Sequence, residues 1–279
     1  MEVYSIPTGF FKLDGGAMFG VVPKTLWNKV QPADENNLCT WALRCLLIAD
    51  GDKLILVDNG IGDKQDARFF SHYYLHGDDT LDKSLAAHGF HRDDITDVLL
   101  THLHFDHCGG SIIREGDRLV PAFKKAVYWS HSRHWKWATE PNDREKASFL
   151  KENILPIQAS GQLRFVDEGG SGVILPGLSV RMVYGHTDAM MLPQFTWRGR
   201  TVVFMADLLP SVHHIQMPWV MAYDMFPLTT LTEKKAFLEE AVAGDYVLFF
   251  EHDPAVECCL LEKSDKGIRK SNTFRLAEL

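Results

Sequence analysis

Short apolar runs separated by polar turn residues fill the first half of the chain, and they predict a β-hairpin and two helices. Residues 43–49 and 53–58 are apolar runs joined by an Asp-Gly-Asp sequence, which is typical of a tight turn. Residues 80–88 have the pattern of a helix, with Thr80 suited to cap its N-terminus. A further helix is expected around residues 143–153.

The second half continues this alternation of strands and helices. A helix is expected over residues 232–243, where Thr232 is a good N-cap and Gly244 ends the helical pattern. The expected buried strands are residues 98–100, 178–184, 201–206 and 246–250. Such an alternation predicts an α/β fold in which helices cover apolar sheets. Because the chain shows no internal repeat and no Pro/Gly/Ser-rich linker, we expect residues 1–279 to form a single domain.

The composition is that of an ordinary globular protein and argues against several other classes. Of the 279 residues, 46% are hydrophobic and 24% are charged, which is too apolar a chain for disorder. The formal net charge is −8, whereas a nucleic-acid binder usually carries a basic excess, so no nucleic-acid partner is expected. No apolar run approaches the roughly 18 residues of a membrane span, so no membrane association is expected either.

The start of the chain and its cysteines indicate a cytoplasmic protein. The first residues contain neither a basic leader nor a long apolar stretch, so they do not resemble a signal peptide. The chain has 5 cysteines, an odd number, and no Cys-x-x-Cys pair, which favours reduced thiols. We therefore expect a cytoplasmic protein whose cysteines are reduced.

The segment with the most chemical information is the run Thr-His-Leu-His-Phe-Asp-His at residues 101–107, directly after an expected strand. In an extended chain, side chains two residues apart point the same way, so His102 and His104 can share one metal ion. Asp106 and His107 follow after the chain bends, and they suit a neighbouring ion. Three imidazoles and a carboxylate would be costly to bury without a partner, and a metal is the simplest partner.

Four ligands are too few for two ions, so further ligands must come from other parts of the chain. His186, Asp207 and His252 each follow an expected strand and precede an irregular loop. Active sites of α/β sheets gather at the carboxyl ends of strands. Four strand ends that present seven ligand-type residues therefore predict a two-metal site.

The His-x-His-x-Asp-His segment at residues 102–107 resembles the signature of the metallo-β-lactamase superfamily. Other segments resemble further motifs of that family: Asp-Asn-Gly at 58–60 in place of Asp-Thr-Gly, Gly-His-Thr at 185–187, Met-Ala-Asp at 205–207, and the Phe-Glu-His-Asp-Pro of lactonase-like members at 250–254. This resemblance covers nearly the whole chain. It implies a four-layer αβ/βα sandwich, in which two mixed β-sheets are flanked by helices.

The resemblance also implies a division of the ligands between two metals. His102, His104 and His186 would bind one metal; Asp106, His107 and His252 would bind the second; and Asp207 would bridge them. Asp58 would orient a metal-binding histidine by accepting its other ring N–H. The expected cofactor is two Zn²⁺ per chain, while iron, manganese and cobalt tolerate the same ligands.

These assignments predict a zinc-dependent hydrolase, in which a metal-bridging hydroxide attacks an ester or lactone carbonyl. Asp106 would carry a proton to the leaving group. The sequence shows no Gly-x-Ser-x-Gly nucleophile elbow, since Gly-Gly-Ser-Gly at 169–172 lacks that order. Two alternatives remain open: a phosphotriesterase- or phosphodiesterase-like hydrolase, and an iron-dependent oxidoreductase similar to persulfide dioxygenases.

We expect the partner of the enzyme to be a small-molecule ester or lactone substrate, as for lactonases and related esterases. The resemblance to lactonases also makes a homodimer possible. Large apolar residues are candidates for the lining of a pocket that binds an acyl chain: Phe19, Trp27, Phe69, Phe70, Met190, Met191 and Trp219. Acyl-homoserine lactonases usually carry a tyrosine three residues after the bridging aspartate, where this chain has Pro210. Tyr223, His213 and His214 are the candidates to replace that tyrosine.

Overall fold

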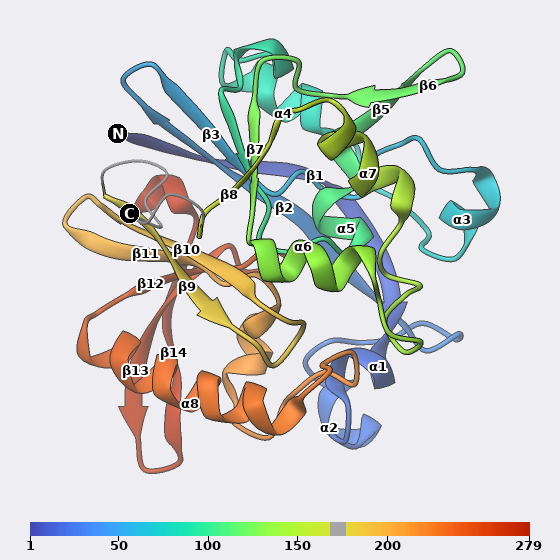
Figure 1. Ribbon diagram of the computed structural model, residues 1–279. Helices are drawn as coiled ribbons and strands as arrows, with labels where there is room; N and C mark the ends of the chain where they lie inside the picture. Colours follow the sequence, from blue (N-terminus) through green and yellow to red (C-terminus); the bar gives the residue numbers. More distant parts are fainter. Residues whose placement is uncertain (168–176) are drawn as a thin grey trace.

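Two six-stranded sheets face each other in the computed structural model, which describes residues 1–167 and 177–279 (Figure 1). The first sheet has the order β1-β2-β3-β4-β7-β8 and the second has the order β14-β13-β12-β11-β10-β9. Each sheet contains both parallel and antiparallel pairs. Together with the flanking helices, this arrangement confirms the predicted four-layer sandwich of two mixed sheets.

The strands are short except at the N-terminus. The first sheet consists of β1 (Glu2–Asp14), β2 (Leu38–Asp50), β3 (Lys53–Val57), β4 (Asp97–Leu99), β7 (Val127–Ser130) and β8 (Leu163–Phe165). The second sheet consists of β9 (Leu178–Val183), β10 (Met190–Trp197), β11 (Arg200–Phe204), β12 (Val247–Phe249), β13 (Cys258–Ser264) and β14 (Gly267–Phe274). A separate hairpin is formed by β5 (Ile112–Glu115) and β6 (Arg118–Pro121).

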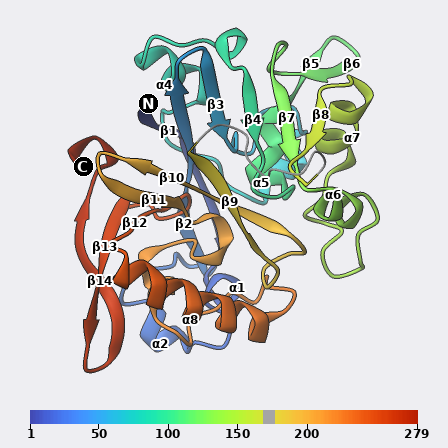
Figure 2. The same ribbon diagram turned by 60° about the vertical axis from the view of Figure 1, so that its left-hand side comes forward.

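The helices are α1 (Gly15–Phe19), α2 (Lys24–Trp27), α3 (Ala67–Ser71), α4 (Leu81–Ala87), α5 (Phe105–Cys108), α6 (Ser132–Thr139), α7 (Lys151–Ala159) and α8 (Pro227–Ala243). Side chains of α4, α6 and α7 pack on the outer face of the first sheet. Helix α8 packs on the second sheet, on the opposite side of the molecule from α4 (Figure 2). None of the helices that the structure describes has the length and apolar character needed to cross a membrane.

Alternation along β2 explains why this sheet is covered on both faces. Leu46 and Ile48 belong to the core between the two sheets, whereas Cys45 and Leu47 belong to the core beneath α4 and α7. Successive residues of a strand point to opposite faces, so a continuous apolar run is what a doubly covered strand requires. All four residues are fully buried.

The expected hairpin and the helix near residue 80 are confirmed, but two helix boundaries differ from prediction. The structure has turns at residues 143–148, and α7 begins only at Lys151. The Asn142 side chain accepts the backbone N–H groups of Arg144 and Glu145, which stabilises a turn instead of a helix. Helix α8 begins at Pro227, before the predicted residue 232, because proline is well suited to the first helical position.

The carboxyl ends of several strands meet at one end of the two sheets. Strands β3 and β4 are parallel, as are β11 and β12. The segments that follow these strands and β9 carry the predicted metal ligands and Asp58. The Gly-Gly-Ser-Gly segment at 169–172 lies outside the described residues.

Candidate metal centre

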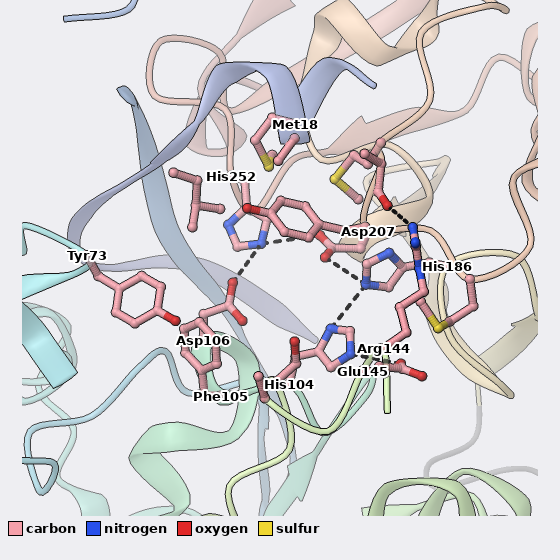
Figure 3. Close-up of a pocket in the computed structure, with 18 residues that line it drawn as sticks. Met18, Tyr73, His104, Phe105, Asp106, Arg144, Glu145, His186, Asp207 and His252 are labelled. Atoms are coloured by element: carbon pink, nitrogen blue, oxygen red, sulfur yellow. Dashed lines mark hydrogen bonds and ion pairs between the residues drawn. The ribbon is translucent and has the colours of Figure 1, made fainter. Parts of the chain in front are cut away.

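The seven residues expected to bind metal are all buried and lie together at this end of the sheets. His104 occupies the N-cap position of the short helix α5, which contains Asp106 and His107. In Figure 3, His104, His186 and Asp207 point toward a common centre, with Asp106 and His252 on its other side. The remaining ligand, His102, follows β4 directly before this helix.

One group of donors contains three imidazoles and a carboxylate. His104 Nδ1 lies 3.1 Å from His102 Nε2 and 3.2 Å from His186 Nε2. Asp207 Oδ2 is 3.1 Å from His186 Nε2. One ligand atom from each of these four residues lies within 4.8 Å of those of the others, a spacing suitable for one metal ion.

A second group lies beside the first. His107 Nε2 and His252 Nε2 are 3.2 Å apart. Asp106 Oδ2 is 3.7 Å from His252 Nε2 and 3.8 Å from His107 Nε2. These three residues also provide ligand atoms within 4.8 Å of one another.

Asp207 lies between the two groups. Its Oδ1 is 3.2 Å from His252 Nε2, and its Oδ2 is 3.1 Å from His186 Nε2 and 3.6 Å from His107 Nε2. One carboxylate therefore contacts histidines of both groups. An aspartate that bridges two metal ions, as predicted from the sequence, needs to lie between the two groups in this way.

Each histidine has one ring nitrogen that faces away from the centre, and this outer nitrogen contacts an oxygen. His104 Nε2 pairs with Glu145 Oε1 at 3.0 Å and His186 Nδ1 with Asp224 Oδ1 at 2.9 Å. His252 Nδ1 donates to the Ala42 carbonyl oxygen at 2.8 Å. Contacts of this kind fix the ring tautomer, because the outer nitrogen carries the proton and the inner nitrogen keeps its lone pair.

His107 and His102 complete this pattern through Asp58. The predicted contact between Asp58 and a histidine of the candidate metal centre is present, since His107 Nδ1 lies 3.1 Å from Asp58 Oδ2. Glu251 Oε2 lies 3.0 Å from the same nitrogen. The Thr101 hydroxyl donates to Asp58 at 2.6 Å and lies 3.1 Å from His102 Nδ1, so it can accept the proton of that ring.

The donor set fits divalent cations. When the outer nitrogens carry the protons, the inner nitrogens face one another in pairs 3.1–3.2 Å apart: His102 with His104, His104 with His186, and His107 with His252. Lone pairs that face each other at this distance repel unless a cation lies between them. Among the described residues, Asp207 Oδ1 accepts no hydrogen bond. Nitrogen and carboxylate ligands in buried groups of three or four are those that zinc prefers.

The charges of the site favour a cation in the same place. Burial lowers the pKa of an imidazole, yet the carboxylates of Asp207 and Asp224 raise the pKa of His186 to about 10. Burial also lowers the pKa of His252, but the Asp207 carboxylate outweighs it and raises this pKa to about 9. Although burial opposes ionisation of Asp207, the surrounding histidines hold the pKa of its carboxyl well below its usual range. The two buried carboxylates thus attract positive charge, from protons or from metal ions.

Close backbone packing holds the end of α5 in place. A Cβ atom on Gly109 would lie 2.1 Å from the Ile61 carbonyl oxygen, and one on Gly110 would lie 2.3 Å from the Asn59 carbonyl oxygen. Both distances are far below a normal contact, so only glycine fits at these positions. The segment after β3, which carries Asp58, is thereby held against the helix that carries Asp106 and His107.

Two residues of the site have backbone conformations that are unfavourable for side chains other than glycine. Asp58 has a φ of 54° and Ala206 has a φ of 40°. Such left-handed conformations cost about 1–3 kcal/mol each and persist where the surrounding structure demands them. Here they direct Asp58 toward His107 and turn the chain sharply just before Asp207.

A cavity of about 500 Å³ opens onto the candidate metal ligands. Its lining includes His104, Asp106, His186, Asp207 and His252. The other lining residues are Leu13, Ala17, Met18, Tyr73, Phe105, Arg144, Glu145, Ala147, Ser148, Met221, Ala222, Tyr223 and Met225. The cavity therefore combines the candidate metal centre with a mainly apolar wall.

The large apolar residues considered for an acyl pocket do not line this cavity, so that prediction is wrong. Phe19 stacks on Trp27 and His214 and contacts Trp219 edge-on, which makes these rings part of a core cluster. Met190 and Met191 are buried between the sheets. Of the three candidates to replace the missing tyrosine, only Tyr223 is among the lining residues that the structure describes.

Three carboxylates that hold histidines were not predicted as such: Glu145, Asp224 and Glu251. Glu145 and Asp224 lie in loops without a periodic pattern, so no sequence signal marked them. Glu251 directly precedes the candidate ligand His252 within the Phe-Glu-His-Asp-Pro motif, and that position is the available sequence signal. Tyr73 was also not predicted as a residue that lines the cavity; the centroid of its ring lies 4.7 Å from that of Phe105.

Comparisons with known proteins agree with this arrangement. The sequence profile described as "Metallo-beta-lactamase superfamily" matches residues 44–252, which includes all seven candidate ligands. No curated protein matches the chain by sequence.

Three solved structures are similar to the chain over most of its length. A probable metal-dependent hydrolase from Staphylococcus aureus is 27% identical, with a TM-score of 0.88, and the match covers 100% of this chain and 98% of that chain. AidC, described as a dizinc quorum-quenching lactonase, is 19% identical, with a TM-score of 0.78 and coverages of 98% and 94%. An N-acyl homoserine lactone hydrolase with a product bound at its catalytic metal center is 20% identical, with a TM-score of 0.69 and coverages of 90% and 93%.

Proposed function

Because the chain belongs to the metallo-beta-lactamase superfamily, we propose that it is a dinuclear metal-dependent hydrolase of esters or lactones. The similarity of its fold to a dizinc lactonase and to a lactone hydrolase supports this choice of reaction. Zinc is the proposed metal, because the candidate ligands are imidazoles and carboxylates.

The position of Asp207 carries the proposal. Its two oxygens lie 3.1–3.2 Å from a histidine of each donor group. Two neighbouring cations can share a carboxylate placed in this way. When bound, the metal ions would supply a water molecule of lowered pKa and would polarise the substrate carbonyl.

Asp106 is the proposed proton carrier. It lines the cavity, and its Oδ2 faces the histidines of the second group at 3.7–3.8 Å. A carboxylate at this position can accept a proton from the attacking water and pass it to the leaving group. The reaction needs no serine or cysteine nucleophile from this chain.

Tyr223 is the proposed donor to the substrate carbonyl, in place of the tyrosine that Pro210 replaces. Its side chain lines the cavity and is 39% exposed, and a phenol ordinarily has a pKa of about 10. The hydroxyl is therefore protonated at neutral pH and can donate a hydrogen bond. His214 is unsuited to this role because its ring nitrogens already contact the Ser211 hydroxyl and the Met18 carbonyl.

The experiment combines metal analysis with a substrate screen. Protein purified without added metal is analysed for zinc, iron, manganese and cobalt, and is then assayed on lactones, aryl esters, thioesters and phosphotriesters. Two zinc ions per chain and hydrolysis of esters or lactones that is lost on chelation and restored by zinc are expected. A preference for phosphotriesters, or a single iron with oxygen consumption on persulfides, would replace the proposal with one of the two alternatives.

A further inference from the structure

Arg144 supplies the cavity with a positive charge that the proposed chemistry does not use. Within residues 1–167 and 177–279, it is the only lysine or arginine that lines the cavity. It lies in the turn before α7, beside Glu145. Figure 3 shows it near Glu145 and His186, on the side of the cavity away from Tyr73.

The hydrogen bonds of Arg144 leave most of its donors available. One guanidinium nitrogen donates to the Ala222 carbonyl oxygen at 2.5 Å. A guanidinium carries five N–H donors, so this bond uses a small part of its capacity. Arg144 is also exposed rather than enclosed by protein, so a ligand can reach it.

The nearest acidic residues in the sequence are already paired with other groups. Asp143 forms an ion pair with Lys146 at 2.8 Å. Glu145 contacts His104 and also accepts from the Trp137 indole N–H at 2.6 Å. Within the described part of the chain, no carboxylate lies within ion-pair distance of the Arg144 guanidinium.

The other charges of the cavity wall are also compensated. Asp106 and Asp207 face the histidine groups, where metal ions would neutralise them. The remaining wall near Met18, Met221 and Met225 is apolar. The guanidinium is thus the uncompensated charge in a cavity that is otherwise neutral or apolar outside the metal centre.

We infer that Arg144 binds a carboxylate on the substrate, so that the preferred ester or lactone carries one negative charge away from the reacting carbonyl. The planar guanidinium fork matches the two oxygens of a carboxylate. A single arginine beside apolar side chains suits one negative charge better than the two charges of a phosphate monoester. This inference rests on the proposed function, because it places the reacting carbonyl at the metal centre.

A matched pair of substrates tests the inference. The anionic member is the para-nitrophenyl monoester of adipic acid, and the neutral member is the same ester with the free carboxylate replaced by a primary amide. The two have nearly the same shape and leaving group, so they differ mainly in charge. Values of kcat/KM for both are measured with zinc-loaded wild-type protein and variants.

Arg144→Gln is expected to lower kcat/KM for the anionic ester by about tenfold to a hundredfold, the range of a lost charge-assisted hydrogen bond. The neutral ester should change less than about twofold, on the same reasoning. Arg144→Lys should retain part of the preference, because it keeps the charge but not the fork. Lys146→Gln is the control, since it removes an exposed charge two residues away that does not line the cavity.

If Arg144 had a purely structural role, through its bond to Ala222, Arg144→Gln would lower kcat/KM equally for the anionic and the neutral ester. That result would overturn the inference. Equal losses of kcat/KM for the anionic ester in Lys146→Gln and Arg144→Gln would also overturn it. Such losses would come from the reduced positive charge of this surface and not from a contact with Arg144. A binding measurement separates this result from failure of the proposed function. If neither ester is hydrolysed, the hydrolytic function fails, and calorimetric titration with the anilide analogue of the anionic ester still tests Arg144. Tighter binding to wild type than to Arg144→Gln supports the carboxylate contact, and equal binding contradicts it.

Discussion

His104 and Glu145 form a buried pair in which the histidine Nε2 and the carboxylate Oε1 are 3.0 Å apart. Although burial raises the pKa of a carboxyl, the contact with His104 and the hydrogen bond from Trp137 lower the pKa of Glu145 to about 2. Glu145 is therefore ionised and accepts the Nε2 proton. This leaves His104 Nδ1 free to face His102 and His186, as a metal ligand must.

The Glu145→Gln variant tests this relationship. A glutamine is a weaker acceptor and lets the imidazole adopt either tautomer, so affinity for the first metal should fall by about tenfold to a hundredfold. Competition with a chelator of known affinity measures the change. Glu140→Gln, an exposed glutamate five residues earlier, is the control and should bind metal like wild type. Unchanged affinity in Glu145→Gln would show that the pair does not orient His104.

Tyr223→Phe tests the donor proposed in place of the missing lactonase tyrosine. Removing the hydroxyl should lower kcat about tenfold or more, because a hydrogen bond that strengthens in the transition state is lost. Metal content should stay at the wild-type value. Tyr74→Phe is the control, since Tyr74 is 52% exposed and does not line the cavity. Equal kinetics for Tyr223→Phe and wild type would remove Tyr223 from the reaction.

Asp106→Asn removes a candidate carboxylate ligand, which is also the proposed proton carrier, with little change in size. Turnover should fall by about two to four orders of magnitude, the range of general acid–base catalysis. Steady-state kinetics at saturating zinc keep the second metal site as full as the variant allows. Wild-type turnover under these conditions would assign the proton transfer to another group.

Metal binding should release protons at neutral pH. In the metal-free site the pKa values of His186 and His252 are raised to about 10 and about 9, so both rings carry a proton at pH 7. A metal must displace these protons, and its affinity should rise with pH until both rings are neutral. Calorimetry in buffers of different ionisation enthalpy counts the protons released. A heat that is the same in every buffer would contradict the assignment.

The stability of the metal-free protein should fall as the pH rises, whereas its affinity for metal should rise. A histidine whose pKa is raised on folding stabilises the fold fully below its ordinary value of 6.5, and this contribution is lost as the pH rises through 9 to 10. The Tm of the metal-free protein should therefore fall over this range.

Strand ends were the features that sequence predicted best. His102, His186, Asp207 and His252 each follow an apolar run, and a run of buried residues is a strong local signal. The structure brings these four residues together from distant parts of the chain. Their role as ligands stays a prediction until metal is measured.

Features that depend on tertiary contacts could not be predicted. Residues 143–148 have the composition of a helix but form turns, because Asn142 caps the backbone locally and Glu145 reaches His104. Large rings such as Phe19 and Trp27 pack on one another instead of lining the cavity. Met221 and Tyr223 line it from a loop that has no periodic pattern, so only the fold reveals their position.

The central claim is that Asp207 is shared by two metal ions, and metal content per chain tests it most directly. Wild-type protein equilibrated with zinc and freed of excess should contain two zinc ions per chain by mass spectrometry of the metals. Asp207→Ala should contain fewer than two and should show no turnover, because both sites lose a ligand. Two firmly bound zinc ions with full activity in Asp207→Ala, or no bound metal in wild type, would contradict the account.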